Sequence, residues 1–248
     1  MLSVSLLAAF PDLVEHALDY GVTGRARERG LWRWRGFGLH EFANDARKSI
    51  DARPAAGGPG MVLMAGPLDR ALTAARGWHG AAPTVVFLSP DGAPLTQPRV
   101  REFAQSPHLC FVAGRYEGID QRWIETNVDA VVSLGDYVLS GGELAAAVVV
   151  DACIRLLPGA LGDHESTEFE SFADDQGGRL DWPQYALTVG NEPLPLGLSG
   201  GDHSVIQRWR LKQALARTWR RRPDLLARAK LSLEERALID EIALESKA

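Results

Sequence analysis

The sequence predicts an α/β fold with a mostly parallel sheet, followed by a small helical domain at the C-terminus. Two observations lead to this fold class. Short apolar runs of strand length alternate with helix-like stretches through the first two thirds of the chain, as in parallel sheets with crossover helices. After residue 158 the chain becomes rich in Gly, Pro and acidic residues, and a helical pattern resumes from Ser204.

The alternating part contains four expected strands and four expected helices. The apolar runs predict buried strands because β-branched and aromatic residues bounded by turn residues favour extended structure. The expected strands are residues 2–10, 84–88, 109–113 and 130–134. The expected helices are residues 11–20, 67–76, 98–105 and 142–157.

Two helices are expected near the C-terminus, behind a linker or long loop at residues 158–202. The first runs from residue 204 to about 222, with Asp202 or Ser204 as its N-cap and Pro223 after its end. The second, residues 232–244, opens with a capping-box pattern of Ser and, three positions later, Glu.

The composition excludes several classes of protein. Cys110 and Cys153 are too few for a disulfide framework, so we expect a reducing, cytoplasmic location. The longest apolar run, residues 144–150, is far too short to span a membrane. The N-terminal apolar stretch has no basic region before it, so we expect a buried strand there rather than a signal peptide.

Common nucleotide, nucleophile and metal motifs do not account for the sequence. Neither GxGxxG nor the phosphate-loop motif occurs, and the six histidines lack metal-ligand spacing, so no transition-metal site is expected. Residues 197–201 match G-x-S-x-G around Ser199, but a nucleophile elbow needs a strand before the serine and a helix directly after it. A Pro-rich stretch precedes this segment, so we expect a loop ahead of a helix.

Three glycine-dense loops, residues 57–61, 114–120 and 134–143, follow apolar runs. Glycine lets the backbone approach a ligand closely, and ligands of open α/β sheets bind beyond the carboxyl ends of the strands. Backbone groups together with Leu134 and Leu139 would suit an adenine ring. Tight turns in a compact domain would explain the same glycines, and spacing alone leaves both interpretations open.

An acidic stretch, residues 163–175, follows Arg155 at the end of an apolar helix. A carboxylate and an arginine beside a ligand loop could form an acid/base pair in which the arginine stabilises the anion left by proton removal. A solvated loop and a capping arginine are the alternative, and the residues alone do not decide between them.

The charge is distributed unevenly along the chain, although its net value is only −5. Residues 114–175 carry a net charge of −10, whereas residues 201–230 carry +7. Arg210, Arg217 and Arg221 fall within about 40° of one another on the expected helix, a surface suited to phosphate contacts. Alternatively, this is a solvated face that pairs with the acidic first domain or with the last helix.

Blocks of residues in order over nearly the whole chain match one known family. The matching blocks are residues 10–11, 20–26, 53–54, 57–61, 88–90, 114–120, 133–143, 158–162, 208–213, 218–219 and 221–223. In these blocks the chain resembles the bacterial tRNA (guanine-N1-)-methyltransferases of the SPOUT class, the TrmD family. The resemblance implies S-adenosylmethionine-dependent methylation of N1 of guanosine 37 in tRNA, next to the anticodon.

The resemblance also implies an architecture. Residues 1–162 would form a cofactor-binding domain with a trefoil knot, residues 163–182 a linker carrying the catalytic acid, and residues 183–248 a helical tRNA-binding domain. Family members are homodimers with the active site at the subunit interface, and the helical domain grips the anticodon arm. Mg²⁺ supports catalysis in the family.

Functional residues carry over position by position. The expected catalytic residues are Glu170 as the base that removes the N1 proton, Arg155 as the partner of O6, and Glu117 near the methyl group. The expected tRNA-binding residues are Arg208, Arg210, Lys212, Arg217 and Arg221. The expected cofactor-binding residues are Leu88, Gly114, Leu134, Gly135, Asp136, Tyr137, Val138, Leu139 and Gly141.

Departures from the family pattern concern the substrate side. Glu170 stands where the family has Asp, and Ala52, Ala55 and Ala56 replace a carboxylate, an aromatic ring and a glycine. These changes leave two alternatives open: a divergent SPOUT paralogue that methylates another acceptor, such as a small heteroaromatic N–H, and an inactive RNA-binding homologue. The basic helix favours tRNA as the substrate.

Overall fold

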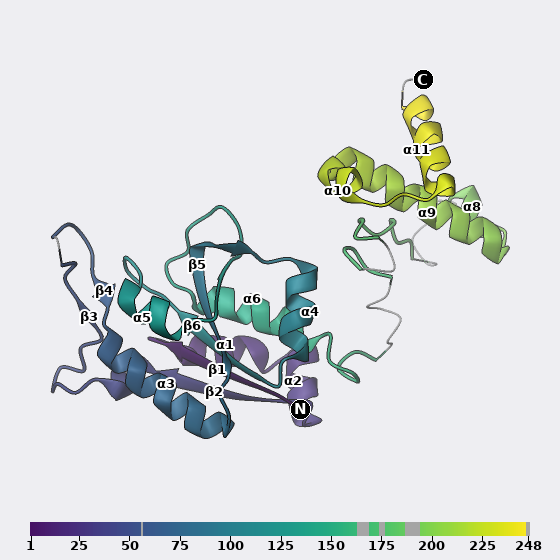
Figure 1. The fold of residues 1–248 in the computed structure, drawn as a ribbon. Helices are drawn as coiled ribbons and strands as arrows, with labels where there is room; N and C mark the ends of the chain where they lie inside the picture. The colour runs from purple at the N-terminus through teal and green to yellow at the C-terminus, as the bar shows by residue number, and fades with distance from the viewer. Residues whose placement is uncertain (56, 163–168, 174–176, 187–193, 247–248) are drawn as a thin grey trace. The chain divides into compact units, whose positions relative to one another are not determined.

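The computed structural model describes residues 1–55, 57–162, 169–173, 177–186 and 194–246, and the chain divides into two compact units at Gly162. The separate linker at 163–182 stays a prediction. The elements of the first unit are β1 (Leu2–Ala8), α1 (Pro11–Leu18), α2 (Gly21–Glu28), β2 (Trp32–Gly38), η1 (Leu39–Phe42), β3 (Asp51–Ala52), β4 (Val62–Leu63), α3 (Ala65–His79), β5 (Thr84–Pro94), α4 (Gln97–Gln105), β6 (His108–Ala113), α5 (Gln121–Asn127), β7 (Ala130–Ser133) and α6 (Glu143–Ile154) (Figure 1).

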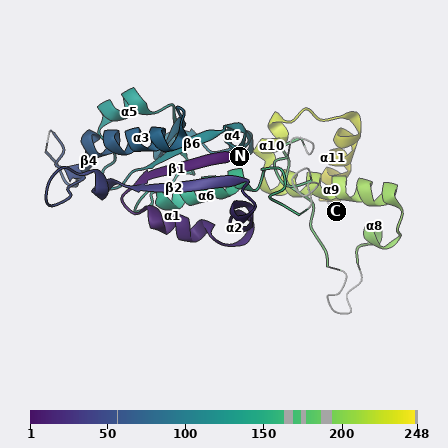
Figure 2. The same cartoon turned by 90° about the horizontal axis from the view of Figure 1, so that it is seen from below.

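A five-stranded sheet in the order β2-β1-β6-β5-β7 forms the centre of the first unit, and each neighbouring pair is parallel. Helices α1, α2 and α6 cover one face, while α3 and α5 cover the other (Figure 2). A parallel sheet covered on both faces needs continuously apolar strands. This confirms the predicted α/β class.

The strands supply two cores because successive side chains point to opposite faces. In β6, Phe111 joins the core beneath α6, whereas Cys110 and Val112 join the core beneath α3. Both cysteines are free and buried, and burial raises the pKa of each thiol to about 12. They therefore act as small apolar core residues.

The predicted strands correspond to β1, β5, β6 and β7, and the predicted helices of this unit to α1, α3, α4 and α6. Helices α2 and α5 and edge strand β2 were not predicted. In β2 the tryptophans alternate with arginines, and the guanidinium of Arg33 stacks on Trp78 at 4.3 Å while its Nε donates to Ser3 Oγ. These contacts come from residues far away in the sequence.

The second unit contains α8 (Leu196–Ser199), α9 (His203–Arg221), α10 (Pro223–Arg228) and α11 (Leu233–Glu245). Asp202 caps α9 by accepting from the N–H of Ser204 at 2.9 Å, and Ser232 and Glu235 form the predicted capping box of α11. Leu215, Leu238 and Ile242 form the core between α9 and α11. The predicted C-terminal helices are confirmed.

The expectation of a linker or long loop up to residue 202 was wrong at α8. Gly197 begins the G-x-S-x-G match and packs on Trp209, since a Cβ on Gly197 would lie 2.3 Å from Cδ1 of that ring. Ser199 ends this short helix, and its Oγ donates to the carbonyl of Leu196 at 3.2 Å. Within the described residues 194–198, no strand leads directly into this serine.

Candidate active site

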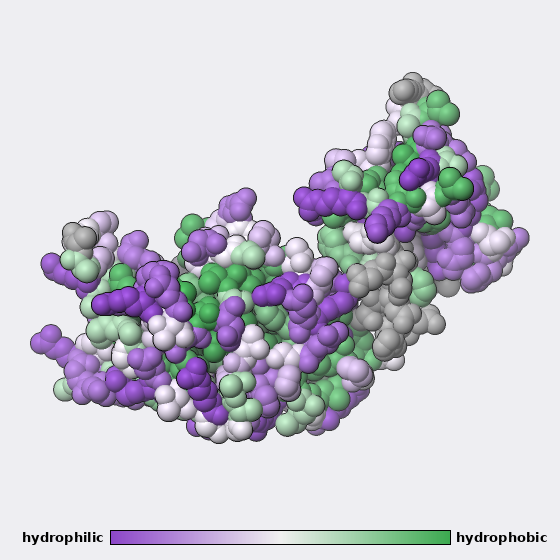
Figure 3. Space-filling model, viewed as in Figure 1, coloured by the Kyte–Doolittle hydropathy of each residue, from purple (hydrophilic) through white to green (hydrophobic). Residues whose placement is uncertain are grey.

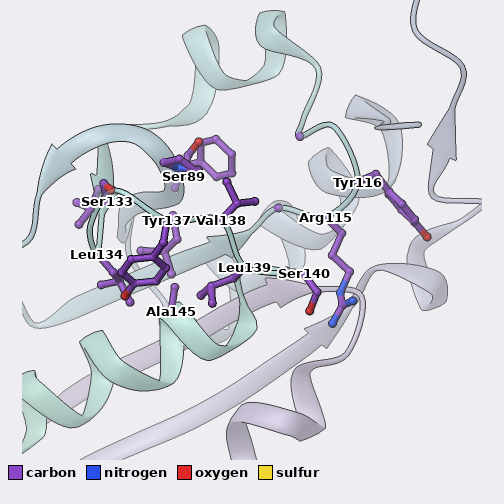
Figure 4. Close-up of a pocket in the computed structure, with 18 of the residues that line it drawn as sticks. Ser89, Arg115, Tyr116, Ser133, Leu134, Tyr137, Val138, Leu139, Ser140 and Ala145 are labelled. Atoms are coloured by element: carbon purple, nitrogen blue, oxygen red, sulfur yellow. The ribbon is translucent and has the colours of Figure 1, made fainter. Parts of the chain in front are cut away.

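A pocket of about 240 Å³ lies beyond the carboxyl ends of β5, β6 and β7 (Figure 4). Its walls come from residues 87–90, 114–118, 132–135 and 137–142, with Ala145 of α6. Strand β5 is irregular here, because Leu88 and Ala93 both pair with Val132 and the residues between them leave the ladder. The bulge brings Ser89 and Pro90 into the pocket wall.

Most of the residues predicted to bind the cofactor line this one pocket. They are Leu88, Gly114, Leu134, Gly135, Tyr137, Val138, Leu139 and Gly141, and Glu117 lies among them. Asp136 is exposed and is not one of the lining residues. Two of the three glycine-rich loops therefore meet where a ligand of an open α/β sheet would bind.

Two glycines permit the conformation of the loop after β7. Gly135 has φ of +149°, which a residue with a side chain rarely adopts. A Cβ on Gly141 would lie 2.5 Å from Oε2 of Glu143 and 2.9 Å from the guanidinium carbon of Arg115. The backbone at residue 141 thus lies directly on this Arg–Glu pair.

Glu117 is held by the third glycine-rich loop, residues 57–61. Its N–H donates to the carbonyl of Met61 at 2.9 Å, and a Cβ on Gly60 would lie 2.3 Å from its Oε1. The preceding residue, Tyr116, has φ of +59°, uncommon for a residue with a side chain. The sequence singled out both loops, but not the contact between them.

Sequence reasoning missed Arg115 and Glu143 as site residues. Arg115 Nε donates to Oε1 of Glu143 at 2.8 Å, the N–H of Phe10 donates to the same oxygen at 3.3 Å, and the Arg115 guanidinium lies 4.6 Å from the Phe10 ring centre. The three residues come from the ends of three different elements. The one indication in the sequence was that all three residues fall within blocks that match the family, residues 10–11, 114–120 and 133–143.

Comparison with known proteins assigns the family. The model of the family described as tRNA (Guanine-1)-methyltransferase TrmD matches residues 2–228. This chain belongs to that family. It is 47% identical over 247 residues to a tRNA (guanine-N(1)-)-methyltransferase of Halorhodospira halophila, covering 99% of this chain and 92% of the relative. A protein of that name from Methylococcus capsulatus is 48% identical, over 97% and 95%, and one from Neisseria meningitidis 43%, over 98% of each.

Arg155, one of the residues that the TrmD family resemblance marks as catalytic, is the C-cap of α6 in the first unit. On this helix it shares a face with Leu144 and Val148, which are spaced 11 and 7 residues before it. Both are about half exposed, although most other residues of α6 are apolar and buried, apart from the exposed Asp151. Figure 3 looks onto the α3 side of the sheet, where hydrophobic residues gather near the middle of the first unit, and α6 lies on the opposite side (Figure 2).

Glu170 belongs to the second unit, whereas the residues that line the pocket belong to the first. It lies in a turn whose backbone is fixed locally: its carbonyl accepts from the N–H of Ala173, and Phe172, with φ of +69°, donates its N–H to the carbonyl of Arg179 at 2.8 Å. Of the acidic stretch around it, residues 163–168, 174 and 175 lie outside the described residues, as does Ala56.

The five predicted tRNA-binding residues lie on two sides of α9. Arg208 and Lys212 pair with Glu241 of α11 at 2.8 and 3.2 Å, and Lys212 also pairs with Glu245. On the other side, Arg210 stacks on Trp182 at 4.9 Å and Arg217 donates to the carbonyl of Asp181. Arg221 is exposed. Pairing with the last helix, one of the two alternatives, thus occurs at two of the five positions.

In the part of the chain that the structure describes, no group of three or more His, Cys, Asp or Glu side chains is placed to hold a metal ion. No helix within the same residues is long and apolar enough to cross a membrane.

Proposed function

We propose that this chain transfers the methyl group of S-adenosylmethionine to N1 of guanosine 37 in tRNA, next to the anticodon. The observation that supports this most directly is the pocket: in a chain of the TrmD family, residues predicted from family motifs to bind the cofactor converge on one cavity. The names of the relatives supply the modified atom, N1 of guanine. The position in tRNA comes from the resemblance.

The residues present fit the cofactor. Leu88, Leu134 and Leu139 offer apolar surface for an adenine ring, and Gly141 lets a backbone segment approach where a side chain would not fit. When bound, S-adenosylmethionine supplies a methyl carbon made electrophilic by the neighbouring sulfonium. The pocket residues hold and orient it and exclude water.

The acceptor needs activation because N1 of guanine carries a proton and is a poor nucleophile. In the proposed reaction the Glu170 carboxylate takes this proton, the N1 electron pair forms the bond to the methyl carbon, and the electrons of the broken C–S bond remain on sulfur. The Arg155 guanidinium stabilises the negative charge that develops on O6. Glu117, which lines the pocket, would lie near the methyl group. None of these steps uses Mg²⁺. Adding EDTA to the methyl-transfer assay described below tests whether Mg²⁺ is required.

We propose a homodimer in which Glu170 of one subunit serves the pocket of the other, within a knotted first domain. The half-exposed Leu144 and Val148 support an interface at α6, because apolar side chains exposed at i, i+4 spacing on one face indicate a contact surface. Arg155 shares that face and would then lie at the interface. The basic surface of α9 would grip the anticodon arm, and a tRNA substrate makes the cytoplasm the place of action.

The test is transfer of labelled methyl groups to tRNA transcripts. We expect labelling of a transcript with G36 and G37, and none when G37 is replaced by A. The Glu170→Gln variant should lose about 10²- to 10⁴-fold in rate, the usual contribution of a general base, with cofactor affinity unchanged. Glu234→Gln, an exposed position on α11, is the matched control and should stay near the wild-type rate.

Two results would overturn the proposal. No labelling of either transcript by a protein that binds the cofactor would point to another acceptor, and labelled small heteroaromatic compounds would then identify the paralogue alternative. Activity that appears only after Glu170→Asp, which restores the family residue, would show that the natural chain is inactive.

A further inference from the structure

Arg115 is the one cationic side chain among the described residues that line the pocket. Its side chain is 21% exposed. Figure 4 shows it beside Ser140, at the rim of the cavity formed by the loop after β7. A positive charge at this place calls for an explanation, because the adenine end of the expected cofactor is uncharged.

The guanidinium is fixed on two sides. Nε donates to Glu143, whose carboxylate is buried to 1% exposure, and the guanidinium plane lies over the Phe10 ring. The Glu143 carboxylate is itself fixed by the N–H of Phe10, and its second oxygen is buried with no hydrogen-bond partner among the described residues. Gly141 lies against both partners of the pair. The position of the guanidinium is therefore set before any ligand binds.

The two terminal nitrogens of Arg115, Nη1 and Nη2, make no hydrogen bond to another residue in the described part of the chain. They carry four donors in a planar arrangement. Arginine used in this way matches the two oxygens of a carboxylate, and charge-assisted bonds of this kind are stronger than neutral ones. The edge of the side chain that points away from Glu143 is thus a preformed site for a carboxylate.

We propose that Arg115 binds the carboxylate of the amino-acid end of S-adenosylmethionine, and that Glu143 is a positioning residue that holds Arg115 for this contact. This inference rests on the proposed function for the identity of the ligand. It assigns a specific role to two residues that lie within matching family blocks but were not among the predicted site residues. Arg115 selects ligands with a carboxylate, whereas the loop of residues 134–141 holds the adenosine.

The test compares two ligands that differ in the carboxylate alone, S-adenosylhomocysteine and its decarboxylated analogue, by calorimetric binding without tRNA. The wild-type protein should bind the analogue about 10- to 100-fold more weakly, as expected for loss of a hydrogen-bonded charge. Arg115→Gln should bind S-adenosylhomocysteine about 10- to 100-fold more weakly than the wild type and should no longer distinguish the two ligands. Arg115→Lys, which keeps the charge but not the planar pair of donors, should retain part of the preference.

Glu143→Gln tests the positioning role, because the amide keeps the shape and loses the charge that holds Arg115. Its preference for the carboxylate ligand should shrink to about a third or less of the wild-type ratio, while affinity for the analogue stays within twofold. Arg99→Gln, at a surface pair with Glu102, is the control and should leave both affinities unchanged.

The outcomes separate the two proposals. Equal affinity of the wild-type protein for both ligands, or an equal loss for both in Arg115→Gln, would overturn the role of Arg115 and leave the proposed function intact. If the wild type bound neither ligand, the proposed function would fail, and this inference with it. The wild-type comparison needs no variant, so it holds even if a substitution at Arg115 prevents folding.

Discussion

The pocket of the first unit and helix α9 of the second both use arginine–glutamate pairs, but the pairs differ in burial. Arg115 and Glu143 are 21% and 1% exposed, and the backbone at Gly141 lies on them. Arg208 and Glu241 are 52% and 43% exposed, on facing helices. Exposed pairs contribute about 1 kcal/mol or less and weaken with salt, whereas a buried pair depends strongly on geometry.

This difference indicates two uses of charge. The buried pair fixes where one guanidinium lies and can be neither rearranged nor removed without consequence for the loop above it. The exposed pairs of α9 are exchangeable, because the phosphates of an RNA can compete with Glu241 and Glu245 for the same cations. Hydrogen bonds that Lys212 donates to Glu245 and Glu241 raise its pKa, so its charge is retained while it pairs with α11.

Gly141→Ala should give the largest effect and tests whether the loop needs the buried pair beneath it. The added methyl group would lie 2.5 Å from the Glu143 carboxylate, which has no room to move. We expect affinity for S-adenosylhomocysteine to fall about 10- to 100-fold, the effect of overpacking by 1–3 kcal/mol. Calorimetric titration measures it.

Gly77→Ala on α3 is the matched control for that substitution. It adds the same methyl group where nothing lies within 4 Å, and alanine favours a helix interior. It should leave the affinity unchanged and raise stability slightly. Wild-type affinity in Gly141→Ala would show that the loop does not rest on the Arg–Glu pair.

A pair of double variants on α9 tests the second half of the comparison, with a smaller expected effect. Arg220 and Arg221 are exposed, with no ion pair within the described residues, whereas Arg208 and Lys212 are paired. Arg220→Gln with Arg221→Gln should weaken tRNA binding about 10-fold at 0.15 M salt and reduce the salt dependence by about two ions. Arg208→Gln with Lys212→Gln removes the same charge and should cost less than about 3-fold.

Filter binding at several salt concentrations measures both double variants. Equal losses of tRNA affinity would show that pairing with α11 does not keep Arg208 and Lys212 from binding the RNA. That result would support RNA binding by all five predicted residues.

The sequence predicts the parts of the fold that local pattern determines. Strands β1 and β6 and residues 85–88 of β5 are mostly apolar because both faces of the sheet are covered there. The caps at Asp202 and Ser232 are local signals. Strand β2 could not be predicted from local pattern. Its Arg33 is accommodated by Trp78, at the edge of the sheet, a contact that no window of neighbouring residues contains.

The candidate site shows the same division. Glycine density and family motifs locate the pocket loops, because the backbone there must approach a ligand. The Arg115–Glu143 pair joins residues 28 positions apart and depends on how β6 and α6 meet. The sequence contains both residues within matching blocks, but only the fold brings one against the other.

His79 extends the comparison to a buried polar contact without a charge, and here the expected effect is on stability rather than on binding. Its Nε2 lies 2.9 Å from Ser5 Oγ, and burial lowers its pKa to about 4, helped by the charges of His108 and Arg33. The unfolded chain, with the ordinary value of 6.5, binds more protons between pH 6.5 and 4. The free energy of unfolding should therefore fall as pH falls through this window, by on the order of 1 kcal/mol per pH unit from this residue.

His79→Gln can keep the bond to Ser5 without the titration, so its urea midpoint should depend less on pH than that of the wild type or of the exposed control His16→Gln. The same pH dependence of the urea midpoint in all three proteins would mean that protonation of His79 does not cause the loss of stability at low pH.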